Sequence, residues 1–408
     1  MNRKELKIVD RALEGFFEQL TTGLGRQEMR QAMADYITGL LLDGKRKSMQ
    51  PMAERLVDDA EEAEAMRQRL QQCVVQSPWQ DDDFRTRLQK TIFKQFEHPE
   101  ALVIDDTGFP KKGNHSVGVH RQYSGTLGRV DNCQIAVSTH IAKRESSCCL
   151  EMQLYLPEVW TADSARRKKA KVPEEIEFAP KTDIALAQLD VLNERGVPKL
   201  PVLADSGYGD GENFRRAISE RGFEYVVSTK GNNLIWIPES SPEIPKRKSN
   251  IGRPRRKYQD KKHPPMQACE YALSLGREAL KKITWDVSDA GPKSSYFGCA
   301  RIRSAYNYSK GMPPGDEEWL VWQWPKGKDQ PTKYWMATLS DKTPLKQIVY
   351  LAKLRWRIER DYQEMKQEVG LTHFEGRTWR GFHHHATLCM AAHAFLVLHR
   401  TIFSPQQS

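Results

Sequence analysis

The most regular hydrophobic pattern of the chain lies between Tyr350 and Phe374. On a helix that turns by about 100° per residue, the apolar side chains of this stretch fall within one sector roughly 80° wide. They are Leu351, Leu354, Ile358, Tyr362, Met365 and Val369. The pattern therefore predicts a helix over 350–374 that packs one face on a core.

Three charged residues lie beside that apolar stripe. Arg355, Glu359 and Lys366 are four and seven residues apart, so on a helix they project within about 40° of one another. Two interpretations fit: a carboxylate held between two cations for a functional purpose, or an ordinary amphipathic helix with intrahelical ion pairs. Glu364 and Glu368 point to the opposite side, which predicts solvated charges.

The first 97 residues have helical periodicity throughout. Apolar positions predict helices over 8–20 and 29–41, the second closed by Gly44, and Ser77–Gln80 predicts the start of a helix that runs to Phe96. The basic turn Gly44–Ser48 favours a helical module that recognises DNA ends. A helical bundle with a solvated loop explains the same pattern.

Two short apolar runs each end in aspartate. The run 101–104 is followed by Asp105 and Asp106, and the run 200–204 by Asp205. Carboxylates just past the end of a buried strand lie where α/β sheets carry their chemistry. Together with Glu359 they can supply oxygen ligands for a pair of Mg²⁺ ions, for which Mn²⁺ could substitute.

The remaining pattern predicts an α/β fold, a mixed sheet flanked by helices. Strands are expected over 133–141, 150–156, 223–229 and 334–339, and helices over 183–195 and 214–220. Tryptophan-bearing strands between 283 and 324 indicate a β-rich insertion. The expected division is a helical domain over 1–97, a first core part over 98–230, the insertion over 231–333 and a second core part over 334–408.

The insertion contains a basic, proline-rich loop over 240–262, which is not expected to have a fixed fold of its own. Its segment 252–256 contains Arg253, Arg255 and Arg256 and is similar to the short arms that enter an A·T-rich minor groove. A flexible loop that attracts phosphate is the alternative interpretation.

Bulk composition points to an acidic partner. The 408 residues have a formal net charge of +10, which favours nucleic acid. No apolar run approaches the ~20 residues of a membrane span, and the polar start lacks a signal-peptide core, so a cytoplasmic protein is expected. Seven cysteines without a CxxC pair argue against a disulfide framework and a zinc module.

Three consecutive histidines, His383, His384 and His385, are a candidate metal cluster. Adjacent residues of a helix point in different directions, so capping and packing near the start of a helix is the favoured interpretation.

Four segments together carry a resemblance to a known family. They are DDTGFPKKG, GVHRQYSGTLGRVDNCQIAV, ADSGYG and RWRIERDYQEMKQEVGLTHFEGRTWRGFHHH. The chain, from about Phe16 to its end, resembles the DDE transposases of bacterial insertion sequences, and more closely the insertion-sequence family numbered seven hundred and one. The resemblance implies an RNase H-like core interrupted by a β-rich insertion, a two-metal site, and cut-and-paste transposition by nicking and strand transfer. It also implies double-stranded DNA partners, namely terminal inverted repeats and target DNA, a homodimer in the synaptic complex, and a place at the bacterial nucleoid.

The resemblance assigns catalytic, metal-binding roles to Asp105, Asp205 and Glu359. Relatives often read Asp-Glu-Thr-Gly at the first position, which favours Asp105 over Asp106. The family's glutamate helix carries Tyr, two residues, Arg, three residues, Glu, six residues and Lys. Arg355, Glu359 and Lys366 keep that spacing, whereas Ala352 occupies the tyrosine position.

Further roles follow from the resemblance. Arg355 and Lys366 are expected to hold DNA phosphates, as are Lys111 and Lys112 after the first aspartates. Because relatives excise through a DNA hairpin with a flipped base, Trp319, Trp322 or Trp324 is a candidate to receive that base, against core packing as the alternative. A catalytically silent DNA-binding regulator and an RNase H-like nuclease without strand transfer are the competing functions.

Overall fold

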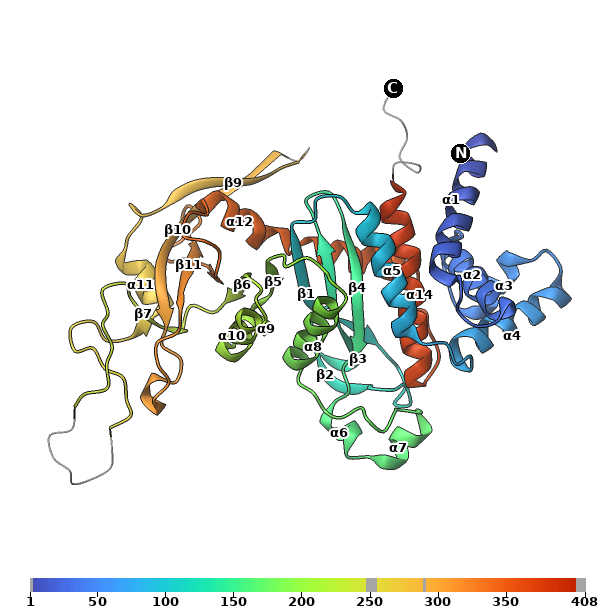
Figure 1. Cartoon of the computed structure of the whole chain (residues 1–408), viewed down its shortest axis with the longest axis horizontal. Coiled ribbons are helices and arrows are strands. Elements are labelled where there is room, and N and C mark those ends of the chain that lie inside the picture. Colours follow the sequence, from blue (N-terminus) through green and yellow to red (C-terminus); the bar gives the residue numbers. More distant parts are fainter. Residues whose placement is uncertain (1–2, 247–254, 289–290, 401–408) are drawn as a thin grey trace. The chain divides into compact units, whose positions relative to one another are not determined.

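The computed structural model describes residues 3–246, 255–288 and 291–400 (Figure 1). The chain divides into two units. The first contains Met1–Glu100, Ile104–Val197 and Trp356–Ser408, and the second contains Ala101–Val103 and Pro198–Arg355.

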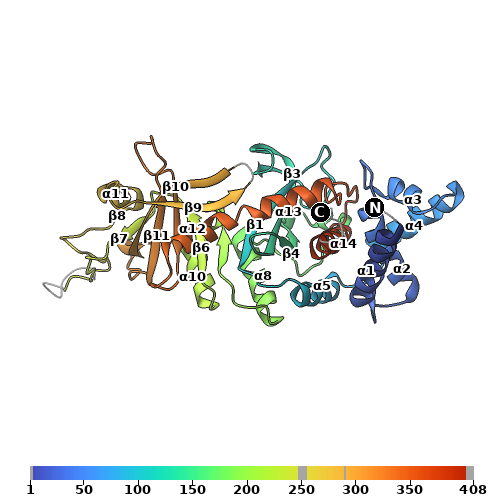
Figure 2. The ribbon, with the colours of Figure 1, turned by 90° about the horizontal axis from the view of Figure 1, so that it is seen from above.

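The N-terminal part of the first unit is helical, as its periodicity predicts. Its helices are α1 (Arg3–Thr21), α2 (Gln27–Leu41), α3 (Met49–Leu56), α4 (Ala60–Val75) and α5 (Asp81–Gln95). Each buries an apolar face, and Leu20, Ile37, Leu70 and Leu88 are fully buried. Helices α2, α4 and α5 pack against α14 (Trp379–Leu398), beside which they lie in Figure 2. Helix α14 is apolar nearly all round, as expected of a helix enclosed by others.

Four strands contribute to the sheet of the first unit: β1 (Ala101–Pro110), which belongs to this unit from Ile104 on, β2 (His120–Ser124), β3 (Arg129–Ala142) and β4 (Ser147–Leu154). Strand β3 pairs with β2 along its first part and with β4 along its second, both antiparallel. Strand β1 is also hydrogen-bonded to β3, since Glu100 N–H donates to Ala142 O and Lys111 N–H donates to Asn132 O. These two bonds show that β1 and β3 run antiparallel.

Three helices follow β4: α6 (Glu158–Thr161), α7 (Ser164–Lys169) and α8 (Lys181–Glu194). Helix α8 packs on β3, where the Gln188 side-chain amide donates to Val137 O at 3.0 Å. Helix α5 is tied to β4 and α8 by ion pairs, because Glu151 pairs with both Arg85 and Arg195. The N-terminal helices therefore pack onto the same unit as the sheet.

The second unit contains the rest of the strands. They are β5 (Val202–Ala204), β6 (Tyr225–Thr229), β7 (Leu234–Trp236), β8 (Met266–Gln267), β9 (Lys281–Ser288), β10 (Gly291–Ser304), β11 (Glu317–Gln323) and β12 (Lys333–Ala337). The hydrogen-bonded order is β5-β6-β12-β11-β10-β7-β8, with β9 paired to β10. Its helical segments are α9 (Ser206–Gly209), α10 (Glu212–Glu220), α11 (Ala268–Ser274), η1 (Tyr308–Lys310) and α12 (Leu345–Leu354).

The predicted β-rich insertion extends the sheet and does not form a separate layer. Strands β5 and β6 are parallel, and β12 pairs antiparallel with β6 on one side and with β11 on the other. The α/β class is confirmed, with a mixed sheet, flanking helices and an N-terminal helical region, consistent with an RNase H-like fold. Among the described helices, none combines the length and apolar character that a membrane crossing requires.

Candidate functional site

Asp105 lies within strand β1 and not past its end, so the expected strand boundary at Ile104 is wrong. The strand continues to Pro110 because its second half pairs with β3. Asp105 is half-buried, and its Oδ1 accepts the N–H of Asp106 at 2.8 Å. Asp106 Oδ2 accepts from Lys181 Nζ at 3.0 Å. This ion pair ties Asp106 to the start of α8, and the choice of Asp105 over Asp106 stays a prediction.

Glu359 lies in the first turn of α13 (Arg357–Gln367) and is exposed. The apolar residues of the predicted stripe are all buried. The single helix predicted over 350–374 is nevertheless wrong, because α12 ends at Leu354, α13 begins at Arg357, and turns follow Gln367. Trp356, in the break between the two helices, is 51% exposed. The stripe was correct because each of the two helices buries its own apolar residues.

Lys366, in the last turn of α13, reaches strand β1. Its Nζ donates to Gly108 O at 2.9 Å and to Thr126 Oγ1 at 3.1 Å, and it lies 5.5 Å from the centre of the Phe109 ring. Burial lowers the pKa of Lys366 to about 8. The helix of Glu359 is thereby fastened to the strand of Asp105 within one unit.

A buried polar network fixes α13 on β3 and β4. Asp361 is 1% exposed and accepts from Ser147 Oγ at 2.5 Å and from His140 Nδ1 at 2.6 Å. Ser138 Oγ lies 3.0 Å from His140 Nε2 and 2.7 Å from Tyr362 Oη. Burial lowers the pKa of His140, which keeps the ring neutral despite the carboxylate.

The direction of each hydrogen bond in this network follows from the two groups at its ends, Asp361 and Tyr362. A carboxylate at Asp361 holds the proton on His140 Nδ1, so Nε2 accepts from Ser138, and Ser138 in turn accepts from Tyr362. Burial and the neighbouring Asp105 charge raise the pKa of Tyr362, which therefore stays protonated. Asp361 and Tyr362 thus set the position of the helix turn that follows Glu359.

The prediction that Glu364 is a solvated charge is wrong. It is half-buried and accepts from His393 Nε2 at 3.2 Å, Arg360 Nε at 3.2 Å and Arg400. The His393 hydrogen bond and these cations lower the pKa of Glu364 to about 2. Glu364 therefore links α13 to α14, whereas Glu368 is exposed as predicted.

Asp205 follows β5 directly, as predicted, and caps α9. It is half-buried and its Oδ1 accepts the N–H of Gly207 at 2.8 Å. The turn is tight: a Cβ on Gly209 would lie 2.3 Å from Ser228 O, so only glycine fits between α9 and β6. Gly209 is thus explained by packing.

The three predicted carboxylates are divided between the units, with Asp105 and Glu359 in the first and Asp205 in the second. Among the described residues, no three or more His, Cys, Asp or Glu side chains lie close enough together to hold a metal ion. The donor set is made only of carboxylate oxygens, which suits a hard cation such as Mg²⁺. Convergence of the three acids stays a prediction.

The predicted DNA-contacting cations have different environments. Lys111 is half-buried, with its Nζ donating to Phe374 O at 3.0 Å, and burial lowers its pKa. Lys112, Arg255 and Arg256 are exposed. Arg355 is half-buried at the end of α12. Arg253, with most of the segment 252–256, lies outside the described residues.

The basic turn after α2 is less basic at its surface than its sequence suggests. Lys47 is 4% exposed, and its Nζ donates to Leu40 O at 2.8 Å and to Leu42 O, so it caps the end of α2. Only Lys45 and Arg46 project from the turn, and Arg46 pairs with Glu375.

The candidate tryptophans of the insertion are mostly packed. Trp322 is fully buried against Gly298, and Trp324 is 6% exposed with its indole N–H donating to Lys328 O. Trp319 is half-buried and donates to Leu339 O at 3.1 Å. Core packing accounts for Trp322, and Trp319 is the most accessible of the three.

The three histidines pack in α14 with separate partners, in agreement with the packing interpretation. His383 contacts Trp379 O and Leu154 N–H, His384 stacks on Trp79 at 3.7 Å, and His385 Nδ1 lies 2.9 Å from Tyr36 Oη. The helix is capped by Thr378 and not by histidine. All seven cysteines are free, and Cys148 and Cys149 are buried.

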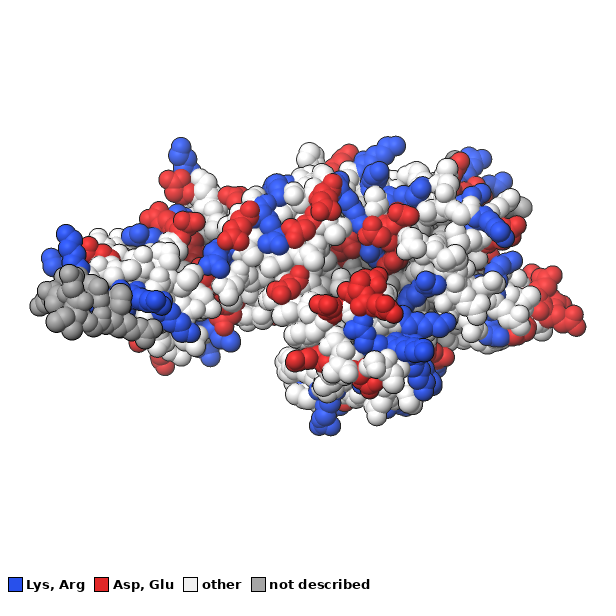
Figure 3. All heavy atoms as spheres, turned by 60° about the horizontal axis from the view of Figure 1, so that its bottom comes forward, with Lys and Arg blue, Asp and Glu red and all other residues white. Residues whose placement is uncertain are grey.

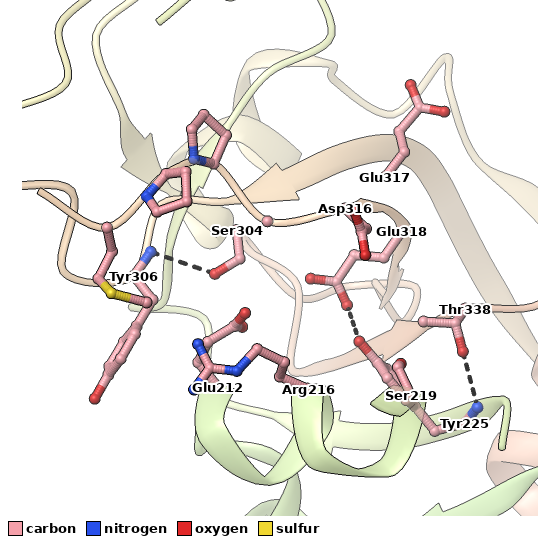
Figure 4. Close-up of a pocket in the computed structure, with 14 residues that line it drawn as sticks. Glu212, Arg216, Ser219, Tyr225, Ser304, Tyr306, Asp316, Glu317, Glu318 and Thr338 are labelled. Atoms are coloured by element: carbon pink, nitrogen blue, oxygen red, sulfur yellow. Dashed lines mark hydrogen bonds between the residues drawn. The ribbon is translucent and has the colours of Figure 1, made fainter. Parts of the chain in front are cut away.

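A pocket of about 210 Å³ lies within the second unit (Figure 4). Its wall includes Glu318, whose Oε2 accepts from Tyr225 Oη at 2.7 Å and lies 3.9 Å from Arg215 Nε. Burial raises the pKa of Glu318 to about 7. The pocket lies among α10, β11 and the loop before β11, and its carboxyl group is not part of the predicted catalytic set.

Comparison with known proteins agrees with this architecture. A family model described as DDE superfamily endonuclease matches residues 17–291, which is more than half of the chain. The chain belongs to this family. The match begins in α1, covers Asp105 and Asp205 and ends at the start of β10. The predicted resemblance to DDE enzymes is therefore confirmed.

The chain is also similar to a probable transposase for insertion sequence element IS701 from Microchaete diplosiphon. The two are 29% identical over 201 residues, which is 49% of this chain and 48% of the relative. The chain thus matches about half the length of that curated relative. The relative is a probable transposase of the same insertion-sequence family that the four motif segments of this DDE family member resemble.

Sequence reasoning missed the His140–Asp361 pair and helix α7. Asp361 adjoins the recognised motif, but its partners are more than two hundred residues away in sequence, and no spacing rule connects them. The sequence did contain a signal for an exposed, charged segment at α7, because the four consecutive cations Arg166–Lys169 are unusual in a buried segment.

Proposed function

We propose that this DDE family member is a DNA transposase that cleaves the ends of an insertion sequence and joins the 3′-hydroxyl ends to target DNA by a cut-and-paste route. The family match and the similarity to a probable insertion-sequence transposase support this function. The observation that carries it is the fastening of α13 to β1 through Lys366 and Gly108, which holds the strand of Asp105 and the helix of Glu359 in one unit.

Asp105, Asp205 and Glu359 would hold Mg²⁺. When bound, Mg²⁺ would supply activation of a water molecule and stabilisation of negative charge on the departing oxygen. The water attacks a phosphodiester at the transposon end, its proton passes to solvent, and the bond to the 3′ oxygen breaks. The freed 3′-hydroxyl then attacks a target phosphodiester, so one phosphodiester bond forms as another breaks.

The remaining residues position the DNA and the carboxylates. Lys366 and Arg355 provide cations for the flanking phosphates, which offsets repulsion between the DNA and the acids. The buried contacts of Asp361 and Tyr362 keep the first turns of α13 in register with β3. We also propose a homodimer on DNA, because two ends must be brought together for strand transfer.

The test is nicking of duplex DNA carrying the element's own flanking sequences, with Mg²⁺ or Mn²⁺. Asp105→Asn, Asp205→Asn and Glu359→Gln are each expected to abolish cleavage while DNA binding persists. Asp106→Asn and Glu368→Gln are the matched controls, one in the same strand and one just past the end of the same helix, and are expected to retain cleavage. Wild-type cleavage by Glu359→Gln would disprove the assignment.

The two competing functions give different results in the same assay. A silent DNA-binding regulator would bind the DNA and leave it intact in the wild type. A nuclease without strand transfer would cleave but form no covalent joint between the cut end and a labelled target duplex. Recovery of joined product therefore distinguishes a transposase from both.

A further inference from the structure

The connection between β4 and α8 carries a group of cations that the predicted site does not include. Helix α7 has four consecutive cationic residues in its last turn, and Lys171 follows directly after its C-cap. Two of them hold the helix in place: Arg166 donates to Asn114 O at 2.8 Å and stacks 3.7 Å above Trp160, and Arg167 donates to Pro173 O at 2.8 Å. Lys168 and Lys169 remain exposed.

Two further segments lie against α7. Trp379 N–H donates to Ala170 O at 2.9 Å, which places the start of α14 beside the end of α7. Val117 N–H donates to Arg377 O at 3.2 Å, which ties the loop after β1 to the same place. These contacts gather exposed cations from three segments of the first unit: Lys112, Lys168, Lys169, Lys171, Arg377 and Arg380, here called the α7 patch.

The α7 patch is not neutralised by the fold. Within the described ranges, none of its side chains has an ion-pair or hydrogen-bond partner. Acids lie close by, since Glu174, Glu175 and Glu177 follow Lys171 within six residues, and Glu175 lines a pocket together with Lys171 and Arg380. Figure 3 shows Lys and Arg side chains gathered over the α7 region, with acidic side chains beside them. Unpaired cations gathered on touching segments create a local positive potential.

Lys171 adopts a left-handed backbone conformation at the end of α7. Its φ is +52°, and Val172 N–H donates to Arg167 O at 3.0 Å, the helix-ending geometry in which glycine normally occupies this position. A side chain other than glycine in this conformation costs about 1 kcal/mol. The chain thus accepts backbone strain to present a lysine at the end of α7.

We propose that the α7 patch binds the phosphate backbone of duplex DNA flanking the cleavage point. This inference rests on the proposed transposase function, because it is that function which brings duplex DNA to Asp105. The patch begins at the end of the strand that carries Asp105. From Asp105 to Pro110 the strand spans about 17 Å at ~3.3 Å per residue. At ~3.4 Å per base pair, a duplex that runs along β1 would meet Lys112, the patch residue that follows this strand, roughly five to seven base pairs from the reacting phosphate.

The first experiment measures binding of the full chain to a fluorescent 40-base-pair duplex of random sequence as a function of NaCl concentration. Each phosphate contact contributes about 0.9 to the slope of log K against log salt, so Lys168→Ala/Lys169→Ala/Lys171→Gly should lower the slope by about 2 to 3. At 100 mM NaCl we expect at least tenfold weaker binding. Lys90→Ala/Lys94→Ala, which removes two exposed lysines of α5, is the matched control and should bind as the wild type.

The single variant Lys171→Gly separates charge from folding. It relieves the strained backbone, so its thermal stability should equal or exceed that of the wild type, while the salt slope falls by about 1. A slope and affinity within twofold of the wild type for the triple variant would overturn the proposal. Polyglutamate serves as a second probe. If the triple variant loses the wild type's binding to polyglutamate but binds DNA as the wild type does, the proposal is also overturned, and an acidic protein surface is identified as the partner.

A second experiment tests the position on DNA. Neutral methylphosphonates placed five to seven base pairs from the mapped cleavage point should weaken binding of the wild type but not weaken the triple variant further. Equal weakening in both proteins would overturn the proposal. If the wild type binds DNA through the α7 patch but never cleaves it, only the transposase function is refuted. If the triple variant cleaves DNA and keeps the wild-type salt slope, only the proposed role of the α7 patch is refuted.

Discussion

Replacement of Lys366 by methionine should weaken DNA binding without weakening the fold. Methionine keeps the long apolar stem beside Phe109 and removes the ammonium group that donates to Gly108 O and Thr126 Oγ1. Two charged hydrogen bonds would suggest a large loss of stability. The burial that lowers the pKa of Lys366 to about 8 opposes that loss, because the charged form is disfavoured in the folded state.

The direction of the stability change follows from the pKa values of Lys366 in the folded and unfolded states. An unfolded lysine titrates near ~10.4. Because the folded pKa is lower, the ammonium form costs stability in full below pH 8, and this cost disappears as the pH rises from about 8 to the unfolded value. Allowing for partial solvent screening, the variant should match or exceed the wild type at pH 6.5 by ~1–3 kcal/mol, and this advantage should shrink above pH 9. Urea unfolding at both pH values measures it.

The effect of Lys366→Met on DNA binding is expected to be opposite to its effect on stability. If Lys366 contacts a phosphate, the variant should lower the salt slope of end binding by about 0.9. A phosphate would also raise the pKa of the lysine, so wild-type binding at pH 8.5 should take up protons and its calorimetric enthalpy should depend on the buffer. Lys366→Arg should retain the salt slope. An unchanged slope and unchanged proton uptake in Lys366→Met would refute the phosphate role and leave the lysine as a fastening between α13 and β1.

Three further perturbations test the site and its supports. Asp361→Asn should reduce Mn²⁺ affinity, measured as a smaller metal-induced rise in Tm, because it weakens the buried contacts to His140 and Ser147 that position α13; an unaltered rise would contradict this. Gly209→Ala should destabilise the second unit by about 1–3 kcal/mol in urea unfolding, since its Cβ would meet Ser228 O, and a neutral result would mean that the turn relaxes. Glu318→Gln should match the wild type at pH 5 and exceed it by up to about 3 kcal/mol at pH 8, because an acid whose pKa is raised by burial to about 7 loses stability as the pH rises; parallel pH profiles would exclude this.

The elements with clear periodicity could be predicted from the sequence. The apolar spacing located α1, α2 and α8 and the buried face of α12 and α13, the start signal at Ser77–Gln80 located α5, and a helix was also expected at α10. The runs before Asp105 and Asp205 located β1 and β5. These features depend on local patterns, which a single sequence contains.

The errors concern contacts between distant residues. Strand β1 continues past Asp105 because β3 supplies hydrogen-bond partners, and nothing local to Asp105 signals this. Glu364 is paired because α14 brings His393 beside it. Lys47 is buried because the chain turns back onto the carbonyl groups of α2. The break before α13 has no proline or glycine, so neither of the usual helix breakers announced it.

The solvent exposure of Trp356 provides an optical reporter next to the proposed catalytic helix. All ten tryptophans lie in the described ranges, and the other nine are buried or half-buried. Iodide or acrylamide should therefore quench Trp356 emission preferentially. Addition of duplex DNA should shield Trp356 from the quencher when the DNA reaches this helix. Because Trp356 lies three residues from Glu359, its emission would report that event without a label on the protein.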